Sequence, residues 1–156
     1  MIPELMLFGQ FVGSWHVDWI WTTDDGRANE LRGEVHFGWI LSGRAIQDTW
    51  IVPGPDEWAN GRPPLGFYGT TIRFFDPALG AWRSTWIDPP NGRVRRFTGG
   101  AVADGIALLS DDEAPQLRWT FTDIQPDSFH WQGEIRAGPS DRWRLHQDGR
   151  LRRAPT

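Results

Sequence analysis

Three polar residues have types and positions that could support acid–base chemistry or the binding of an anion: Asp48, Arg73 and Tyr68. Asp48 alternates with apolar neighbours, so that Ile46 and Trp50 share its face of a predicted strand. A carboxyl group within an apolar stripe is a candidate general acid or base, and the commoner alternative is a structural ion pair with an arginine of a neighbouring strand. Asp48 is therefore a candidate for catalysis and for ligand binding.

Arg73 lies in an aromatic and β-branched run, on the same alternating face as Thr71 and Phe75. If that face is inward, the guanidinium needs a partner because an unpaired buried charge is costly, and a ligand carboxylate, phenolate or enolate could supply it. If the face is outward, Arg73 is ordinary solvated surface. Tyr68 is the only tyrosine and follows a long loop, so it is a candidate proton donor or ligand contact, or else caps an edge of the core.

The eleven tryptophans include further candidates for ligand contacts. Aromatic residues are common in strands and bury much area, so core packing accounts for most of them. The others could form walls against which a flat apolar or aromatic molecule stacks, with Ser84 as a polar anchor. The predicted ligand-binding residues are Trp39, Asp48, Trp50, Tyr68, Arg73, Ser84, Trp86, Trp119 and Trp131.

Composition excludes several kinds of chemistry. The chain has no cysteine and no lysine, which excludes thiol nucleophiles, thiolate metal sites, disulfides and Schiff-base catalysis. The net charge of -4 and the lack of a basic patch argue against a nucleic-acid partner. The histidines show no metal-binding spacing, so we expect no metal and no cofactor. The N-terminal segment lacks the features of a signal peptide, so we expect a cytoplasmic protein without a membrane span.

The elements that would carry these residues are strands, because apolar residues alternate with polar ones between clusters of Gly, Pro, Asn and Asp. Helical spacing occurs only over 3–11, where Pro3, Glu4 and three apolar residues predict one short helix. The proline-rich segment 53–65 predicts a long loop that could act as a lid over a binding site. The predicted strands cover 11–23, 31–39, 45–52, 66–76, 81–88, 93–102, 106–110, 116–124, 128–136 and 142–147.

About ten strands joined by short turns predict an all-β fold, a single antiparallel up-and-down β-barrel over 1–156 with the N-terminal helix plugging one end. Closure removes exposed sheet edges, which favours a barrel over a sandwich. A barrel of this size could hold a small ligand, or large side chains could fill it. The central question is therefore whether the interior is a pocket or a packed core.

Gly13-Ser14-Trp15, which opens the first predicted strand, resembles the Gly-x-Trp signature of lipocalins and other calycins. Segments 41–44, 69–77 and 82–88 extend the resemblance over nearly the whole chain to uncharacterised lipocalin-like barrel proteins of bacteria. The final hairpin, 138–143, departs from the usual turn but keeps its tryptophan. The resemblance implies the fold and an interior ligand site, and it implies no reaction.

One group of calycin barrels, the nitrobindins, holds haem through a histidine late in the chain, and His146 has a similar place in this sequence. Its neighbours Leu145 and Gln147 do not reproduce that motif, so the resemblance implies haem only as a minor alternative. Alternation also assigns His146 and Glu134 to polar, outward faces of their strands.

We expect the barrel to bind a small hydrophobic molecule that is aromatic or acidic. The alternative is an enzyme that uses the cavity for acid–base chemistry of the cyclase or isomerase kind, with Asp48 paired with Arg73 or Tyr68. A third alternative is a packed barrel whose exposed aromatic residues bind a protein partner, and association into a homodimer is also open. Convergence of the three polar residues on one cavity would favour catalysis.

Overall fold

The computed structural model describes residues 2–112 and 114–155. Its helical elements are η1 (Pro3–Leu5), α1 (Met6–Gly9), η2 (Leu41–Gly43), α2 (Pro55–Ala59) and η3 (Pro89–Asn91). Its strands are β1 (Gly13–Thr22), β2 (Ala28–Ile40), β3 (Ala45–Val52), β4 (Phe67–Asp76), β5 (Ala81–Asp88), β6 (Arg93–Val102), β7 (Gly105–Ser110), β8 (Gln116–Gln125), β9 (Ser128–Arg136) and β10 (Arg144–Arg153). Within the described ranges, every helix is too short or too polar to span a membrane.

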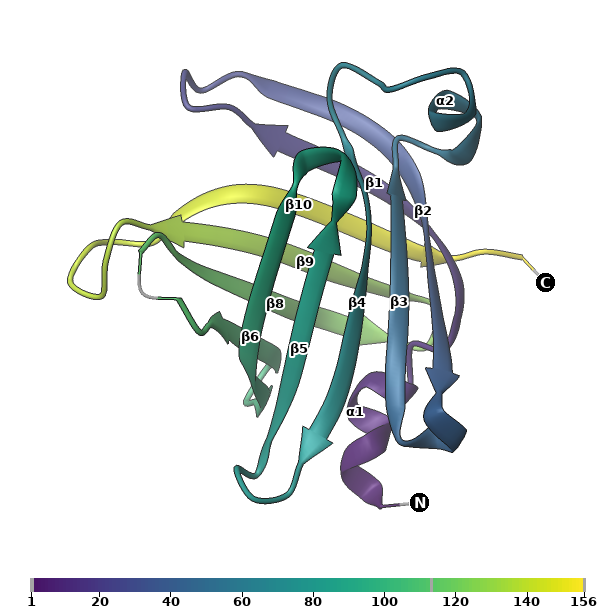
Figure 1. The fold of residues 1–156 in the computed structure, drawn as a ribbon, viewed down its shortest axis with the longest axis vertical. Coiled ribbons are helices and arrows are strands. Elements are labelled where there is room, and N and C mark those ends of the chain that lie inside the picture. Colours follow the sequence, from purple (N-terminus) through teal and green to yellow (C-terminus); the bar gives the residue numbers. More distant parts are fainter. Residues whose placement is uncertain (1, 113, 156) are drawn as a thin grey trace.

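The ten strands close into one antiparallel barrel, in which sequence neighbours pair and β10 returns to pair with β1 (Figure 1). Alternation sets the inward face: in β1, Trp15, Val17 and Trp19 are buried, while His16 and Ile20 are exposed. Each strand has a neighbour on both sides, so its backbone groups are paired within the barrel. The predicted up-and-down barrel is confirmed. The domain limits of 1–156 stay a prediction, since residues 1, 113 and 156 lie outside the described ranges.

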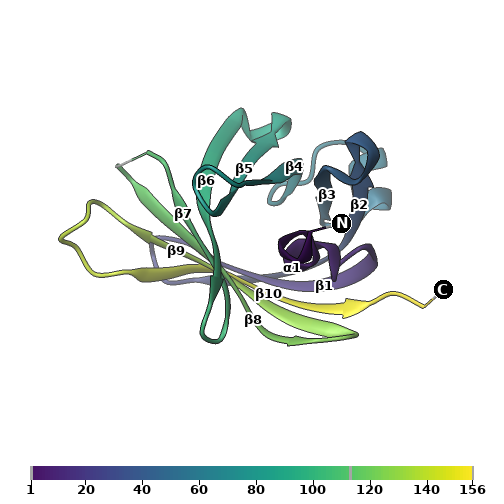
Figure 2. The same ribbon diagram turned by 90° about the horizontal axis from the view of Figure 1, so that it is seen from below.

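Helix α1 plugs one end of the barrel (Figure 2). Phe8 in the helix and Phe11 just after it are both buried in the interior. The Phe8 ring packs edge-on against Trp82, with centroids 4.8 Å apart, and Phe11 stacks on Phe121 at 5.6 Å. Aromatic pairs in these arrangements stabilise a core beyond the area that they bury. This half of the barrel is therefore a packed core.

Arg153, the last residue of β10, fastens the plug to the barrel. Its guanidinium lies over the ring of Trp15, 4.2 Å from the centroid. It also donates hydrogen bonds to the backbone oxygens of Gln10 at 3.2 Å and Val12 at 2.9 Å. A further bond reaches the carbonyl oxygen of Pro126 at 3.1 Å. Carbonyl groups that follow a helix lack intrahelical partners, so this single cation satisfies acceptors that would otherwise need water.

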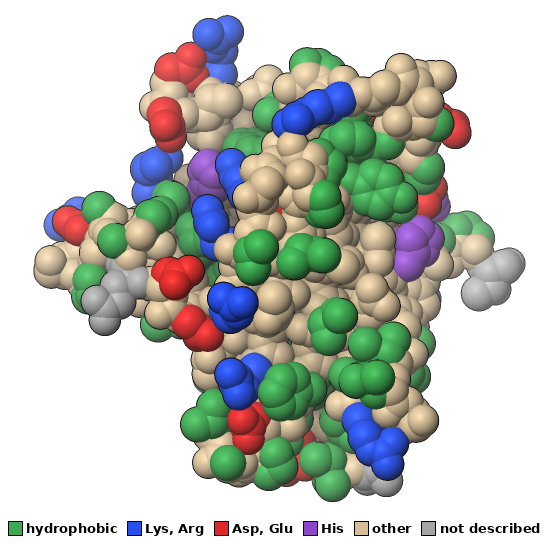
Figure 3. Space-filling model, in the orientation of Figure 1, with side chains coloured by type: hydrophobic (Ala, Val, Ile, Leu, Met, Phe, Trp, Pro, Cys, Tyr) green, Lys and Arg blue, Asp and Glu red, His purple; other side chains and the backbone are tan. Residues whose placement is uncertain are grey.

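The outer face of β4 and β5 carries several exposed apolar side chains. Tyr68 points outward and packs edge-on against Trp58 of α2, with ring centroids 5.7 Å apart. Ile72, Phe74 and Ile87 are each about two-fifths exposed on the same side of the sheet. Figure 3 shows that hydrophobic side chains on this face lie among polar ones. A homodimer or a protein partner at this face stays a prediction.

Candidate functional site

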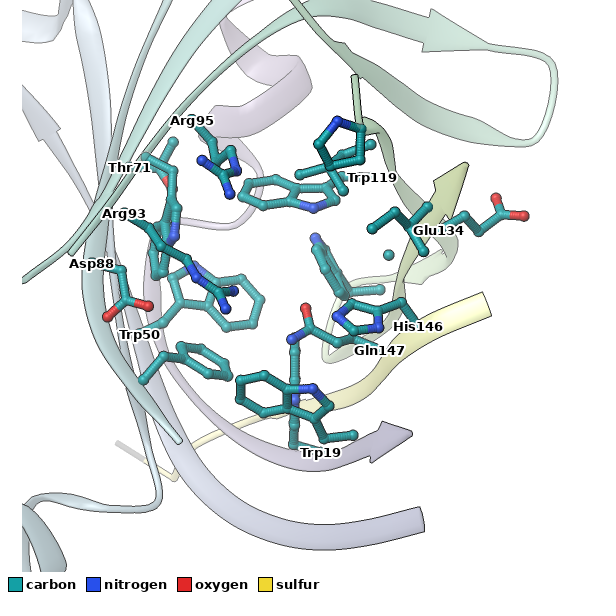
Figure 4. A pocket seen from close by; sticks show the side chains of 18 of the residues that line it. Trp19, Trp50, Thr71, Asp88, Arg93, Arg95, Trp119, Glu134, His146 and Gln147 are labelled. Carbon is teal, nitrogen blue, oxygen red and sulfur yellow. The ribbon is translucent and has the colours of Figure 1, made fainter. Parts of the chain in front are cut away.

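The half of the barrel away from α1 contains a pocket with a volume of about 190 Å³ (Figure 4). Aromatic rings from six strands form most of its wall, so the pocket extends across the barrel interior. These rings belong to Trp19, Trp21, Trp50, Phe67, Trp86, Trp119 and Trp131. The sequence left open whether the interior is a packed core or a pocket. The structure has both, with a packed core around α1 and a pocket beyond it.

The rings of the pocket wall hold one another in place. Trp19 stacks on Trp131, with centroids 5.0 Å apart and planes inclined by 30°, and Trp119 stacks on Phe97 at 3.9 Å. An inward-facing glycine leaves the room that one of these rings needs, because a Cβ at Gly149 would lie 2.9 Å from the Trp19 ring. A side chain there would displace the ring. The wall is therefore a preformed surface of tightly packed rings.

A buried polar layer separates the pocket from the packed core. The guanidinium of Arg73 donates to the carboxylate of Asp48 from Nε at 2.8 Å and from Nη2 at 3.1 Å. Trp50 Nε1 donates to the same carboxylate at 2.7 Å, and Arg73 Nη1 donates to Ser84 Oγ at 3.2 Å. Beneath the layer, the Arg73 guanidinium lies 4.7 Å from the centre of the Phe8 ring. The strand-to-strand ion pair, which was one of the two roles considered for Asp48, is present.

This pairing changes the role expected for Arg73. Its side chain is 1% exposed and that of Asp48 is 0% exposed, so the two charges balance each other inside the barrel. Arg73 therefore does not need a ligand anion as its partner. Arg73 and Thr71 line the pocket, whereas Asp48 and Ser84 lie behind them and do not.

Three buried hydrogen-bonding groups of the lining have no partner among the described residues, and one of them is the Nδ1 atom of His146. The other two are the indole Nε1 of Trp19 and the hydroxyl of Thr71, whose side chains are almost fully buried. Leaving such a group unpaired costs about 1–3 kcal/mol. The wall of the pocket therefore contains unpaired polar groups as well as rings.

Arg93 and Arg95 enter the pocket from β6, and neither was predicted from the sequence. Figure 4 shows both guanidinium groups on one side of the pocket, turned toward its middle, with His146 and Gln147 on the opposite side. A sequence signal was available, because both arginines lie at two-residue spacing from Phe97, which is fully buried, and so share its face of the strand. Period-two spacing therefore assigns these two cations to the inward face of their strand.

Two carboxylates also border the pocket, and both are engaged by other groups. Asp88 accepts hydrogen bonds from Asn91 Nδ2 at 2.8 Å and from the backbone nitrogen of Tyr68 at 3.4 Å. Glu134 forms an ion pair with Arg118 at 2.8 Å. Its carboxylate points away from the pocket (Figure 4), as expected for the outward face of β9. Neither acid lies free inside the cavity.

The outward orientation predicted for His146 is wrong, because β10 has a bulge between Leu145 and Gln147 where it pairs with β9. The extra residue breaks the alternation. Leu145 is 46% exposed as a result, and both His146 and Gln147 line the pocket. Burial of His146, with the positive charges of Arg144 and Arg93 nearby, lowers the pKa of its imidazole. The ring is therefore neutral at pH 7, with an Nδ1 atom that is buried and has no partner among the described residues.

Besides Asp48 and Ser84, two more of the predicted ligand-binding residues lie outside the pocket. Tyr68 is 42% exposed on the outer face of β4, because its neighbour Phe67 takes the inward position. Trp39 lies at the plugged end, where its ring sits so close to Gly9 of α1 that a Cβ there would clash with it. Segment 53–65 supplies no lining residue, and its Trp58 packs on Tyr68 outside the barrel, so the segment does not cover the pocket in this structure. The predicted residues that do line the pocket are Trp50, Arg73, Trp86, Trp119 and Trp131.

The chain matches no family model, and no curated protein is similar to it in sequence. Among solved structures it is similar to Rv2717c from M. tuberculosis, with a TM-score of 0.71 and 19% identity over 99% of each chain. It is also similar to the S-type phycobiliprotein lyase CPES from Guillardia theta, with a TM-score of 0.64 and 10% identity over 100% of this chain and 99% of the other. At identities this low the similarity shows a shared fold, and it carries no information about activity. Fold and site together define a ten-stranded antiparallel barrel with an aromatic interior pocket.

Proposed function

We propose that this protein is a lipocalin-like, cytoplasmic barrel that binds a small hydrophobic molecule with a flat ring system. The observation that carries the proposal is the pocket of about 190 Å³ with seven aromatic rings in its wall. Pockets for drug-sized ligands measure about 300 to 1,000 Å³, so this one suits a smaller molecule, such as two fused rings. Flat rings can lie against the stacked indoles, which are held in place before the ligand arrives.

Binding is favoured over acid–base catalysis by the positions of the candidate catalytic residues. Asp48 lies behind Arg73 and accepts three hydrogen bonds from Arg73 and Trp50. Tyr68 lies on the outside of the barrel. A general acid or base must reach the proton that it transfers, and neither group reaches the cavity. The cyclase or isomerase alternative thus lacks the pair of residues on which it depended.

The test is calorimetric titration with 2-naphthamide, a flat and uncharged two-ring molecule. We expect binding of one molecule per chain, weakened about fivefold in Trp119→Leu because one stacking contact of about 1 kcal/mol is lost. Trp143→Leu is the matched control. The guanidinium groups of Arg118 and Arg136 lie 4.5 and 4.2 Å from the centre of the Trp143 ring, and Trp143 does not line the pocket.

The control variant should bind 2-naphthamide as the parent protein does. Absence of saturable binding by 2-naphthamide and by its acidic counterpart 2-naphthoate would overturn the proposal. Equal weakening by Trp119→Leu and Trp143→Leu would also count against it, because the probe would then not be in the pocket.

Haem bound through His146 is a second candidate, and one observation favours it. The imidazole faces the pocket, is neutral at pH 7, and has a buried Nδ1 without a partner among the described residues. A neutral imidazole is the form that binds a metal. The cavity is a poor fit, since about 190 Å³ is below the usual range for cofactor pockets.

Absorbance spectra recorded while hemin is added distinguish the two candidates. If the ring-binding proposal holds, hemin gives no one-to-one complex that depends on His146. A stoichiometric complex whose Soret band shifts in His146→Leu would favour the haem candidate instead.

A further inference from the structure

We propose that the ligand of this pocket is an aromatic acid whose carboxylate is bound by Arg93 and Arg95. The inference rests on the proposed function, because it assigns the polar end of a molecule whose rings lie in the same pocket. It also moves the anion-binding role from Arg73, which was one of the candidates from the sequence, to two residues of β6.

The first argument is that these two cations have no acidic partner among the described residues. The ion pairs within 2–112 and 114–155 include neither Arg93 nor Arg95. The side chain of Arg95 donates a hydrogen bond to the carbonyl oxygen of Val94 at 3.2 Å, an acceptor without charge. The third guanidinium of the lining, that of Arg73, is in contrast neutralised by Asp48.

The second argument is the balance of charge around the pocket. The charge of Glu134 is offset by Arg118, and that of Arg73 by Asp48. Among the described residues of the lining, what remains is Asp88 against two guanidinium groups, which is an excess of positive charge. A cleft with low-dielectric walls concentrates the field of such an excess and attracts an anion.

The third argument is geometric. Arg93 and Arg95 stand two residues apart on one face of β6, which places their backbones about 7 Å apart along the strand. Figure 4 shows both guanidinium groups turned toward the middle of the pocket, while Asp88 lies at its edge, where its carboxylate accepts hydrogen bonds from Asn91 and from the backbone of Tyr68. Arginine side chains at this separation are long enough to converge on one carboxylate, and the planar guanidinium group matches the two carboxylate oxygens.

The remaining lining defines the rest of the ligand. The rings of Trp19, Trp119 and Trp131 favour a flat aromatic body. The unpartnered hydroxyl of Thr71 and the indole N–H of Trp19 could each donate to an acceptor atom on that body. The class that fits both the walls and the arginines is a small fused-ring carboxylic acid.

The experiment compares 2-naphthoate with 2-naphthamide, which have the same rings and nearly the same shape but differ in charge. At low ionic strength we expect the parent protein to bind the acid about tenfold more tightly than the amide, as one net charge-assisted contact would give. In the double variant Arg93→Gln with Arg95→Gln, affinity for the acid should fall to that for the amide. Affinity for the amide should not change.

Arg96→Gln is the matched control, because Arg96 lies between these positions and Phe97 on the same strand and is exposed on its outer face. It should leave both affinities as they are. A second measurement needs no substitution: raising ionic strength from about 0.01 M to about 1 M shortens the screening length from about 30 Å to about 3 Å. The preference for the acid should then shrink, while binding of the amide stays constant.

The outcomes separate this inference from the function on which it rests. If both probes bind equally, with no effect of salt or of the arginine substitutions, the pocket binds rings and the inference about the acid is wrong. If Arg96→Gln removes the preference as fully as the double variant, the carboxylate is not held by Arg93 and Arg95. If neither probe binds, the proposed function fails, and the inference fails with it.

Discussion

Arg73 on β4 and Asp48 on β3 form a two-point ion pair inside the barrel, with nitrogen–oxygen distances of 2.8 and 3.1 Å. The pair forms part of the boundary between the packed core and the pocket, since Phe8 lies on one side of the guanidinium and the pocket on the other. Its members come from neighbouring strands, so it also ties β3 to β4. Removing one partner of a charge pair at this depth leaves the other charge buried and unpaired, which strongly destabilises the fold.

Asp48→Asn should therefore lower the free energy of unfolding by about 3 kcal/mol, because it leaves a buried guanidinium without a counter-charge. Denaturant unfolding followed by tryptophan fluorescence measures the change. The double variant Asp48→Leu with Arg73→Met removes both charges and should be more stable than Asp48→Asn. A double variant that is the less stable of the two would mean that the pair contributes net stability beyond mutual neutralisation.

Arg153→Ala should destabilise the plugged end of the barrel by about 2 kcal/mol. The substitution removes charge-assisted hydrogen bonds to Gln10, Val12 and Pro126, together with the contact over Trp15. Hydrogen exchange should show faster exchange in α1 than in the strands around the pocket. Arg153→Lys should restore little of the stability, because an ammonium group cannot reach all of these acceptors in one plane. Full recovery of stability in Arg153→Lys would contradict this explanation, because it would show that a positive charge alone stabilises the plugged end.

Stability should fall in acid partly through His146. Its pKa in the folded chain lies below the ordinary value of 6.5, because of burial first and then the charges of Arg144 and Arg93, with Asp24 acting in the opposite direction. The unfolded chain therefore takes up this proton more readily. The contribution of His146 is present above pH 6.5 and is lost as the pH falls from there through the folded-state value.

Unfolding free energies measured at about pH 8 and about pH 5 test this expectation. His146→Gln should lose less stability between the two conditions than the parent protein loses. His16→Gln, at an exposed position on β1, should behave as the parent does. Identical losses in the parent and in His146→Gln would contradict the burial of this imidazole.

Tyr68→Phe and Trp58→Leu should leave the affinity for 2-naphthamide within about twofold of the parent value. Both side chains pack on the outside of the barrel, and segment 53–65 does not line the pocket. Calorimetric titration of each variant measures the affinity. A large loss in either variant would restore the hypothesis of a lid or of a tyrosine contact.

Alternation in the sequence was sufficient to predict ten strands, the closed barrel and the burial of most tryptophans, although the strand predicted over 142–147 continues to Arg153 as β10. The reason is local, since successive side chains of a strand point to opposite sides and one side of a barrel wall must be apolar. The same rule would also have identified Arg93 and Arg95, because they share a face with Phe97. They were missed because charged residues on an inward face are uncommon.

Long-range pairing settled what alternation left open. Whether Asp48 met Arg73 or a ligand depended on the register between β3 and β4, which residues far apart in the sequence establish together. His146 entered the pocket through a bulge that arises only where β10 pairs with β9. The extent of the pocket depended on how far α1 and its phenylalanines fill the barrel. Period-two spacing states which side chains share a face, whereas contacts between strands and the volume left between side chains are properties of the closed barrel.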